Sequence, residues 1–537
     1  MKLKHIYISF FILTVIFYSC KKGKPYWDAD FVAPITSSSL NLTNLFPDTL
    51  LTANANGSLK IAIESNVFSY NADSLLKLPD TTIYNYFGPL LFPGSYFTYF
   101  PGQSWDMNPQ NEVTFSLPNG VKLKEAVIRS GKLRIKVKNP LRQVVYFTCN
   151  VTSATKNGSV LNIVIPMPAG TAVNPSITDT LVDVSGYKLN FAGISGAKSN
   201  TVVQNLTFQI APTASPDTLK YGDTLKSYIT FVNLIPDFGR GYFGSQTLQV
   251  GPDTTVFDVF NQLSSGTLGL DSTEIKLIVT NEFGIDMRSM INSLKSINPQ
   301  NSTISLAGPN VGTPFNIGRA TATGNPILPV IPVIKTFTFN QSNSTITQFI
   351  GNLPKAISYD LNAQINPLGN LSGFNDFIYY GTSLGAKMQA TIPLRFSANN
   401  IVLRDTSVFN ASVLEKQFNN INEGFLLLRA TNSYPFSLKI TGILLDATNN
   451  AIETLISAPG NIIEAPSLDA NNMVISPKES FIKLPFDKGV LSSLLKAKKI
   501  CYYIEFNTPN SPVNITFYNN YKLDLLLTAD VNYSINK

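Results

Sequence analysis

The chain has 537 residues, of which 44% are hydrophobic and only 14% are charged, and its formal net charge is +7. The apolar fraction is sufficient for folded cores, which excludes a globally disordered chain. The 41 Lys and Arg residues are spread thinly along the sequence, which argues against a nucleic-acid partner, since nucleic-acid-binding proteins cluster these residues on one face.

The N-terminus has the pattern of a secretory signal peptide. Lys2 and Lys4 precede an almost unbroken apolar stretch of twelve residues at 6–17. A membrane-spanning helix needs about twenty apolar residues, whereas a shorter stretch suits the central part of a signal peptide. Residues 1–19 are therefore predicted to be a signal peptide.

The apolar stretch ends in "FYSC", which resembles the lipobox of bacterial lipoproteins, with the small residue Ser19 directly before Cys20. It departs from the usual pattern in having Phe17 where Leu is common and the bulky Tyr18. The resemblance implies cleavage before Cys20 and acylation of its thiol and new amino group. Two or more acyl chains anchor a protein stably in a bilayer. The alternative is a plain secretory signal followed by an incidental cysteine.

The residues after the cysteine bear on the location. Lys21, Lys22 and Lys24 follow it, in a chain rich in Asn, Ser, Thr, Ile, Phe and Tyr, a composition that suggests the Bacteroidota. Surface-exported lipoproteins of that phylum tend to carry acidic residues at this point, so the lysines favour an outer-membrane protein that faces the periplasm. They would also attract anionic head groups by about 1 kcal/mol each, or serve only as a soluble tether.

Residues 20–95 are interpreted as the anchor, a tether and an N-terminal β segment that completes the first of the repeats described below. The densest aromatic run of the chain starts in this segment and ends at Trp105. Core strands of the first repeat are the favoured interpretation, because aromatic residues dominate β cores. If exposed, the run would form a contact surface for a protein, glycan or lipid, with Tyr84, Tyr86, Phe92, Tyr96, Tyr99 and Trp105 as its candidate residues.

A strand that ends in asparagine occurs three times, at 131–139, 273–281 and 424–432. Alternate residues of each copy are apolar and are predicted to face a core: Leu133, Ile135 and Val137; Ile275, Leu277 and Val279; Leu426, Leu428 and Ala430. A phenylalanine precedes each final asparagine by 23 or 24 residues (Phe115, Phe257 and Phe409). In the second and third copies, a helical stretch at 344–354 or 489–499 leads into another strand.

These landmarks predict an all-β chain of tandem antiparallel, immunoglobulin-like β-sandwich repeats with a few short helices. The repeats are placed at 96–238, 239–390 and 391–537. The strand, Asn turn, strand order resembles that of uncharacterised multi-domain outer-membrane lipoproteins of the Bacteroidota. That resemblance implies no activity.

The catalytic inventory is sparse. The one histidine, His5, lies in the signal, so the mature chain lacks the commonest general base and metal ligand. Cys149 and Cys501 sit in apolar strand-like runs of different repeats and are expected to be buried free thiols rather than a disulfide. No phosphate-binding glycine loop and no cofactor or metal motif is found.

We therefore expect a non-enzymatic lipoprotein that serves as a spacer and interaction scaffold. Its expected partners are the lipid bilayer, through acylated Cys20, and an envelope protein, with no nucleic acid. The alternative is a lipid- or glycan-binding lipoprotein that uses an inter-sheet cavity or the aromatic run. A hydrolase would require two carboxylates roughly 5–10 Å apart in one cleft, and no spacing in the sequence indicates such a pair.

Asp followed by Ser or Thr recurs in a form that resembles the O-glycosylation acceptor pattern of exported Bacteroidota proteins. The candidate acceptors are Thr49, Ser74, Thr81, Thr180, Thr218, Thr224, Thr254 and Ser272. Turn formation is the alternative explanation, because several of these triplets follow proline. Both can hold, since a glycan needs an exposed site.

Overall fold

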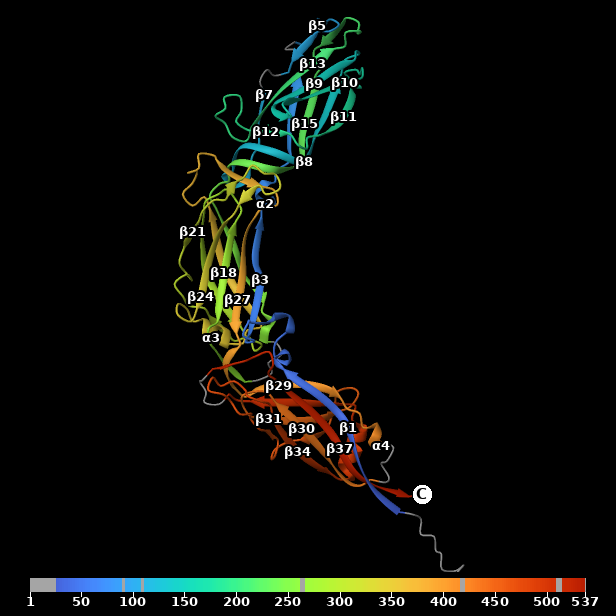
Figure 1. Cartoon of the computed structure of the whole chain (residues 1–537). Helices are drawn as coiled ribbons and strands as arrows, with labels where there is room; N and C mark the ends of the chain where they lie inside the picture. The colour runs from blue at the N-terminus through green and yellow to red at the C-terminus, as the bar shows by residue number, and fades with distance from the viewer. Residues whose placement is uncertain are drawn as a thin grey trace, which may run out of the picture.

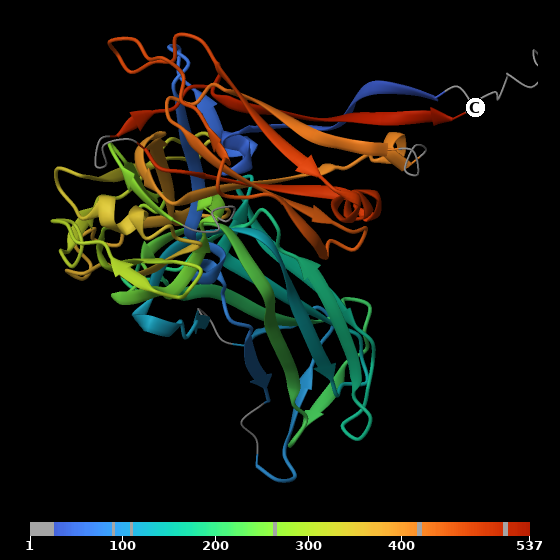
Figure 2. The ribbon, with the colours of Figure 1, turned by 90° about the horizontal axis from the view of Figure 1, so that it is seen from below.

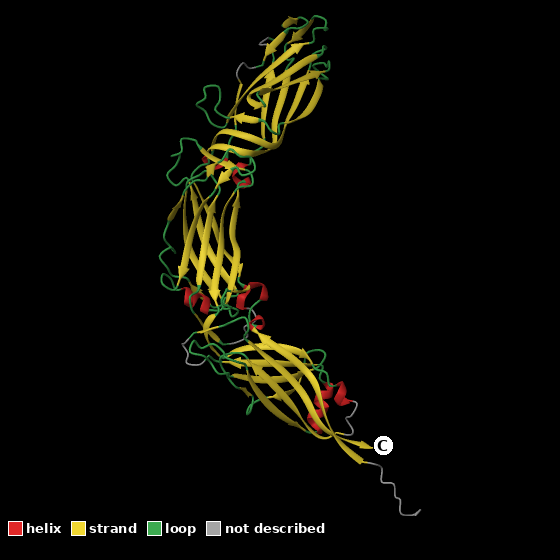
Figure 3. Ribbon diagram, viewed as in Figure 1, coloured by secondary structure: helices red, strands yellow, loops and turns green. Residues whose placement is uncertain are grey.

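The structure is a computed structural model that describes residues 26–88, 92–107, 111–260, 266–415, 421–508 and 514–536. Antiparallel β-sandwiches are stacked end to end into a long arc (Figure 1). The short helices lie at the ends of the sandwiches (Figure 3): α2 (Asp73–Leu76), α3 (Ile346–Gly351), α4 (Ser412–Glu415) and α5 (Lys488–Lys496). The prediction of an all-β sandwich fold with few short helices is confirmed.

One sheet has the same strand order in each sandwich. In the first it is β4 (Thr81–Phe87), β15 (Leu225–Tyr242), β8 (Lys122–Asn139), β11 (Ser176–Asp183). In the second it is β3 (Leu59–Asn71), β27 (Ser383–Pro393), β18 (Glu274–Asn281), β24 (Val333–Asn340), with β2 (Leu51–Ala53) beside β3. In the third it is β1 (Tyr26–Asn41), β37 (Lys522–Asn536), β30 (Ile421–Asn432), β34 (Lys478–Phe486).

The facing sheets also correspond. The first is built from β13 (Thr201–Ile210), β9 (Val145–Lys156) and β10 (Ser159–Met167), with β6 (Ser104–Asp106) and β7 (Asn111–Thr114) at one edge and β12 (Lys188–Asn190) between β8 and β9. The second is built from β16 (Gln246–Val256), β25 (Ala356–Ile365), β19 (Met287–Ile297), β20 (Thr303–Ser305) and β21 (Phe315–Ile317). The third is built from β29 (Ile401–Val408), β35 (Lys499–Phe506), β31 (Leu438–Leu445), β32 (Ala451–Ile456) and β33 (Ile462–Ile463).

The predicted core residues are buried because alternate side chains of a strand share one face. All nine inward-facing residues of the three asparagine-ending strands are at most 4% exposed, and Phe115, Phe257 and Phe409 are also buried. The predicted helical stretch at 344–354 contains α3 and that at 489–499 overlaps α5, and the two helices lead into β25 and β35. These expectations are confirmed.

The asparagine that ends each of these strands ties the two sheets together. Asn139 accepts from the backbone N–H of the second residue after it and donates to the carbonyl of the fourth, at 2.9 and 3.0 Å, and its amide also donates to Pro168 at 2.8 Å, beyond β10 in the facing sheet. Asn281 and Asn432 make the same three bonds, with Gly318 and Glu464 in the place of Pro168. All three asparagines are fully buried, where unpaired polar groups are costly.

The N-terminal segment differs from the expectation that it would complete only the first repeat. Its strands β1, β3 and β4 are divided among the third, second and first sandwiches, and each pairs with the last main strand of its sandwich. Strand β1 pairs with β37 from Tyr26 opposite Asn536 to Asn41 opposite Lys522 (Figure 2). The described chain therefore begins and ends at the same end of the arc.

The predicted limits between the repeats, 238/239 and 390/391, fall inside β15 and β27. The chain leaves the first sandwich after Tyr242 and the main sheet of the second after Pro393.

At the first junction, a strand from the second sandwich joins a sheet of the first. Strand β26 (Asp376–Tyr379), from a loop of the second sandwich, pairs with Phe238–Gly241 of β15 in the first. Phe377 of this strand bonds in both directions with the backbone of Gly284, at 2.9 and 3.3 Å. A Cβ on Gly284 would lie 2.3 Å from the Phe377 ring, so the close approach requires glycine.

The second junction is a small shared sheet of β17 (Thr267–Leu270), β28 (Arg395–Asn399) and β36 (Ile515–Thr516). Phe396 and Phe517 stack across it with ring centroids 4.2 Å apart. The backbone of Phe517 also bonds Leu394 at 2.8 Å and Leu59 at 2.9 Å. Neighbouring sandwiches are therefore linked by backbone hydrogen bonds as well as by the chain itself.

Candidate functional site

The aromatic run divides into an exposed set and a buried set. Tyr84 and Tyr86 on β4 are 70% and 76% exposed, and Phe92 and Tyr96 are similarly exposed at the far tip of the first sandwich. Tyr99, by contrast, is fully buried, so its place in a contact surface is corrected. The tip lies at the end of the arc opposite Tyr26 (Figure 1).

Trp105 belongs to the buried set more than to the surface. Its half-buried ring stacks on Phe87 at 5.8 Å and meets the edges of Phe97 and Tyr99 at 6.3 Å each. Strand β5 (Tyr96–Tyr99), which pairs with β14 (Asp217–Lys220), covers this cluster. The sequence could not separate the two sets, because prolines interrupt the alternation that would show which rings point inward.

The exposed rings frame a groove of about 320 Å³ on the outer face of β4 and β15. Tyr84 and Tyr228 meet edge to face at 5.3 Å, and Tyr86, Thr224 and Lys226 complete the lining. The groove therefore offers aromatic rings, a hydroxyl and an ammonium group to a ligand. Sequence reasoning missed Lys226 and Tyr228, because only the pairing of β15 with β4 brings them to the rings.

The predicted modification sites are scattered over the arc. Thr49, Thr254 and Ser272 are exposed, whereas Thr81, Thr180, Thr218 and Thr224 are half-buried. The backbone of Ser74 lies in α2. Asp217 and Asp253 each accept a bond from the N–H of the following Thr, but both pairs lie within strands, β14 and β16, and not in turns. Cys20 and the lysines after it lie outside the described residues.

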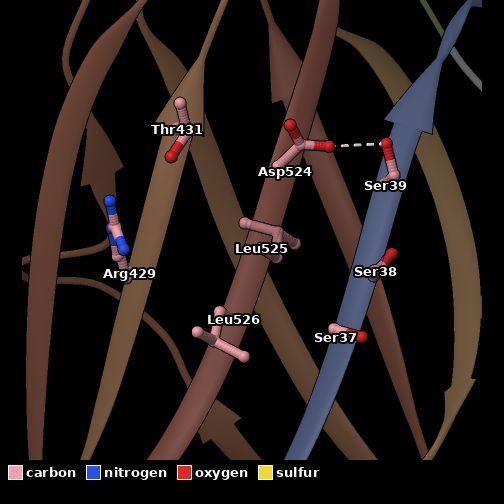
Figure 4. A pocket seen from close by; sticks show the side chains of 8 residues that line it. All are labelled: Ser37, Ser38, Ser39, Arg429, Thr431, Asp524, Leu525 and Leu526. Carbon is pink, nitrogen blue, oxygen red and sulfur yellow. Dashed lines mark hydrogen bonds between the residues drawn. The ribbon is translucent and has the colours of Figure 1, made fainter.

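A second groove, of about 510 Å³, lies on the outer face of β1, β37 and β30 (Figure 4). Ser39 donates to Asp524 at 2.7 Å, and Lys522 pairs with the other oxygen of Asp524 at 2.8 Å. Arg429 pairs with Glu479. The charged groups here satisfy one another, as expected of a solvated sheet face.

A third hollow, of about 630 Å³, lies where the hairpin of β22 (Thr321–Ala322) and β23 (Val330–Ile331) approaches the first junction. Its two carboxylates already have partners. Asp237 pairs with Arg129 at 3.0 Å, and Glu282 accepts from the backbone N–H of Ser383 at 2.7 Å. Both carboxylates of this hollow therefore serve contacts within the junction.

The most unusual titratable group is Asp376, at the start of β26. It is fully buried and accepts from the side-chain amide of Asn366 at 2.8 Å. Its Oδ1 accepts no hydrogen bond from any residue that the structure describes and lies 3.4 Å from Nη2 of Arg319. Burial raises the pKa of Asp376, and the bonds from Ser372 and Asn366 and the charge of Arg319 oppose that rise. Sequence reasoning missed this site, because "GFND" is typical of a surface turn.

Cys149 in β9 and Cys501 in β35 are buried free thiols in different sandwiches, as predicted. Burial raises the pKa of Cys149 to about 12, which suppresses its reactivity. Within the described ranges, no three His, Cys, Asp or Glu side chains gather as a metal site requires. No helix of the described part is long and apolar enough to span a membrane.

Comparison with known proteins identifies no family. No family model and no curated protein matches the chain. A crystal structure described as that of "a putative secreted protein from Parabacteroides distasonis" aligns over 94% of this chain and 99% of its own, with 9% identity and a TM-score of 0.34.

Proposed function

We propose that the protein is a non-enzymatic, lipid-anchored spacer and interaction scaffold of the bacterial outer envelope. The observation that carries this proposal is the route of the N-terminal segment, which contributes one edge strand to every sandwich between Tyr26 and Phe87. The segment thus runs the length of the arc, and an anchor at Cys20 would hold the third sandwich at the membrane and the first sandwich away from it.

The junctions support a fixed spacing between the ends. Interfaces between domains of one chain usually permit relative motion, unless extensive contacts restrict it. Here β26 crosses the first junction and the sheet of β17, β28 and β36 crosses the second. A change in the angle between neighbouring sandwiches would break backbone hydrogen bonds at their junction. The first sandwich is therefore held at a constant distance from the third.

Within the envelope, we place the anchor in the outer membrane with the chain facing the periplasm, on the basis of Lys21, Lys22 and Lys24. Acylated Cys20 would bind the bilayer, and an envelope protein would meet the first sandwich. Protease treatment of whole cells tests the orientation, since digestion of the intact protein would show that it faces outward instead.

Scattering and cross-linking together test the spacer role. Small-angle X-ray scattering of the purified protein should give one extended particle, and a photo-cross-linker at Tyr86 in intact outer membranes should capture a partner. The same cross-linker at Thr431, on the outer face of the third sandwich, should capture none or only lipid. A compact particle, or equal capture from the two positions, would contradict the proposal.

The second candidate is a ligand-binding lipoprotein, and the tyrosine groove at the tip favours it. The surface supports this function better than the interior does. An inter-sheet ligand would have to lie in the centre of the first sandwich, and phenylalanine rings fill that space. The ring centroid of Phe115 lies 5.7 Å from that of Phe191 and 5.1 Å from that of Phe231. Lipid extracted from purified protein would overturn this preference.

A further inference from the structure

The outer face of the sheet β4-β15-β8-β11 combines tyrosines with a line of cations. Tyr86 lies opposite Lys226, which lies opposite Lys138. In the next row, Tyr84 lies opposite Tyr228, which lies opposite Lys136. Along β8, Lys132 and Arg134 continue the outward set, so that cations follow one another about 7 Å apart on one strand.

Among the described residues, Arg134 is the one cation of this line that forms an ion pair within 4 Å, while Lys136 and Lys132 lie across from Asp179 and Asp183 and help to lower the pKa of these carboxyls. Asp179 and Asp183 of β11 are the acidic residues opposite β8, and Asp179 is taken by Arg134 through bonds of 2.9 and 2.6 Å. Among the described residues, none pairs within 4 Å with Lys132, Lys136, Lys138 or Lys226. Basic residues that are spread thinly along the sequence are thus gathered on one sheet face. Such a face attracts a negatively charged partner.

We propose that this face binds an acidic polysaccharide, one of whose charged sugar rings enters the tyrosine groove. A uronic acid has an apolar ring face, hydroxyl groups and a carboxylate. The groove matches each of these with the rings of Tyr84, Tyr86 and Tyr228, the hydroxyl of Thr224 and the ammonium of Lys226. Its volume of about 320 Å³ is at the lower end of the range for small-ligand sites, which suits one or two sugar rings.

Two other anionic partners fit less well. The face lies at the tip of the arc, far from Tyr26, so the membrane that holds the tether is out of its reach (Figure 1). Nucleic acids are commonly bound through arginine forks to phosphate, and the guanidinium of Arg134, the arginine in this line of cations, is already held by Asp179. Free lysines act instead as point charges, which suit separate carboxylates along a chain.

The inference rests on the second candidate function, for which it names the ligand class of the tyrosine groove, and it can fail while the spacer role stands. The test uses the full-length protein in non-ionic detergent, titrated with polygalacturonate in 150 mM salt. Length-matched dextran, oligothymidine and phosphatidylglycerol vesicles are titrated in parallel. We expect polygalacturonate to bind, dextran to fail, and the affinity to fall as salt is raised.

A triple variant of Lys136→Ser, Lys138→Ser and Lys226→Ser removes the unpaired cations. It should weaken binding by about tenfold or more, given what single exposed charge pairs contribute. The matched control, Lys295→Ser, Lys496→Ser and Lys498→Ser, removes the same charge from exposed positions on the other sandwiches and should change the affinity less than about twofold.

A second pair of variants separates charge from shape. Changing the three face lysines to arginine keeps the charge and should retain binding, whereas Tyr84→Ser with Tyr86→Ser should lose affinity at unchanged charge. Melting curves of every variant report folding. The proposal is overturned if polygalacturonate does not bind, if oligothymidine or vesicles bind more tightly, or if the control variant loses as much affinity as the triple variant. None of these outcomes bears on the scattering and cross-linking that test the spacer.

Discussion

The side-chain amide of Asn139 donates a 2.8 Å hydrogen bond to the carbonyl oxygen of Pro168, and so joins the end of β8 to the chain beyond β10 in the facing sheet. Because Asn281 and Asn432 make equivalent bonds, this tie is part of how each sandwich closes. Its removal leaves a buried N–H and carbonyl groups without partners.

Asn139→Ala is therefore expected to destabilise the first sandwich by about 3 kcal/mol, since each buried polar group without a partner costs about 1–3 kcal/mol. Asn139→Asp keeps the size of the side chain but loses both donors, and should be similarly harmful. The matched control is Asn162→Ala on the exposed face of β10, which should stay within about 0.5 kcal/mol of wild type. Denaturant unfolding measures both, and equal effects would refute the role of the tie.

The pairing of β1 with β37 predicts that the third repeat does not fold well alone. A fragment of residues 391–537 would expose the edge of β37 that β1 covers, and exposed strand edges associate. We expect oligomers or aggregates in size-exclusion chromatography. Fusion of residues 26–45 to the fragment through a flexible linker should restore a monomer. A stable monomeric fragment without the added strand would contradict the shared-edge interpretation.

The burial of Asp376 predicts how the first junction responds to pH. Because burial raises the pKa of Asp376 in the folded state, the protonated form is favoured by folding. Its contribution is fully present below the unfolded pKa of about 3.9 and is lost as the pH rises through the folded value. Wild type should therefore lose stability on this account between acidic and neutral pH.

Asp376→Asn should remove that part of the pH dependence, and its melting temperature relative to wild type should rise from pH 4 to pH 7. Asp48→Asn, at an exposed position, is the control and should follow wild type. The prediction fails if the difference between Asp376→Asn and wild type is the same at both pH values.

The lipobox-like "FYSC" predicts that Cys20 holds the protein in the membrane. In cells that express Cys20→Ser, the acyl groups cannot be attached, so the protein should leave the detergent phase on Triton X-114 partition. Intact mass should show acyl groups on the wild type only. Cys501→Ser serves as the control, since that thiol is buried and accepts a hydrogen bond from Nε of Arg404 at 3.2 Å. Wild type without acyl groups would refute the anchor.

Exposure ranks the candidate O-glycosylation sites. Thr49, Thr254 and Ser272 are exposed, so we expect them to be modified before the half-buried Thr180 or Thr218. Peptide mapping of native protein should place any sugar on these residues, and Thr254→Ala should remove one increment of mass. A polypeptide mass with no addition beyond the lipid would show that the triplets carry no glycan.

The sequence predicted the features that depend on residues near one another along the chain. The alternation around Leu133, Ile275 and Leu426 identified the inward faces, and the terminal asparagines marked the strand ends. Nothing in the sequence of β1 indicated β37, because an edge strand pairs through its backbone, and the partners lie about 500 residues apart. For the same reason, the gathering of Tyr84, Tyr86, Lys136 and Lys226 on one face became visible only with the register of the strands.

The N-terminal strands are divided among the three sandwiches. They therefore set the order in which the sandwiches can be completed while the chain is being synthesised. Strand β4 can pair with β15 once residue 231 has emerged, whereas β3 must wait for β27 at 393 and β1 must wait for β37 at 536. The first sandwich is thus completed first and the third last, and β1, the earliest of the described strands to be made, is the latest to be paired. Loop closure over such distances is slow. A chain that folds as it is synthesised therefore keeps this strand unpaired until β37 is made.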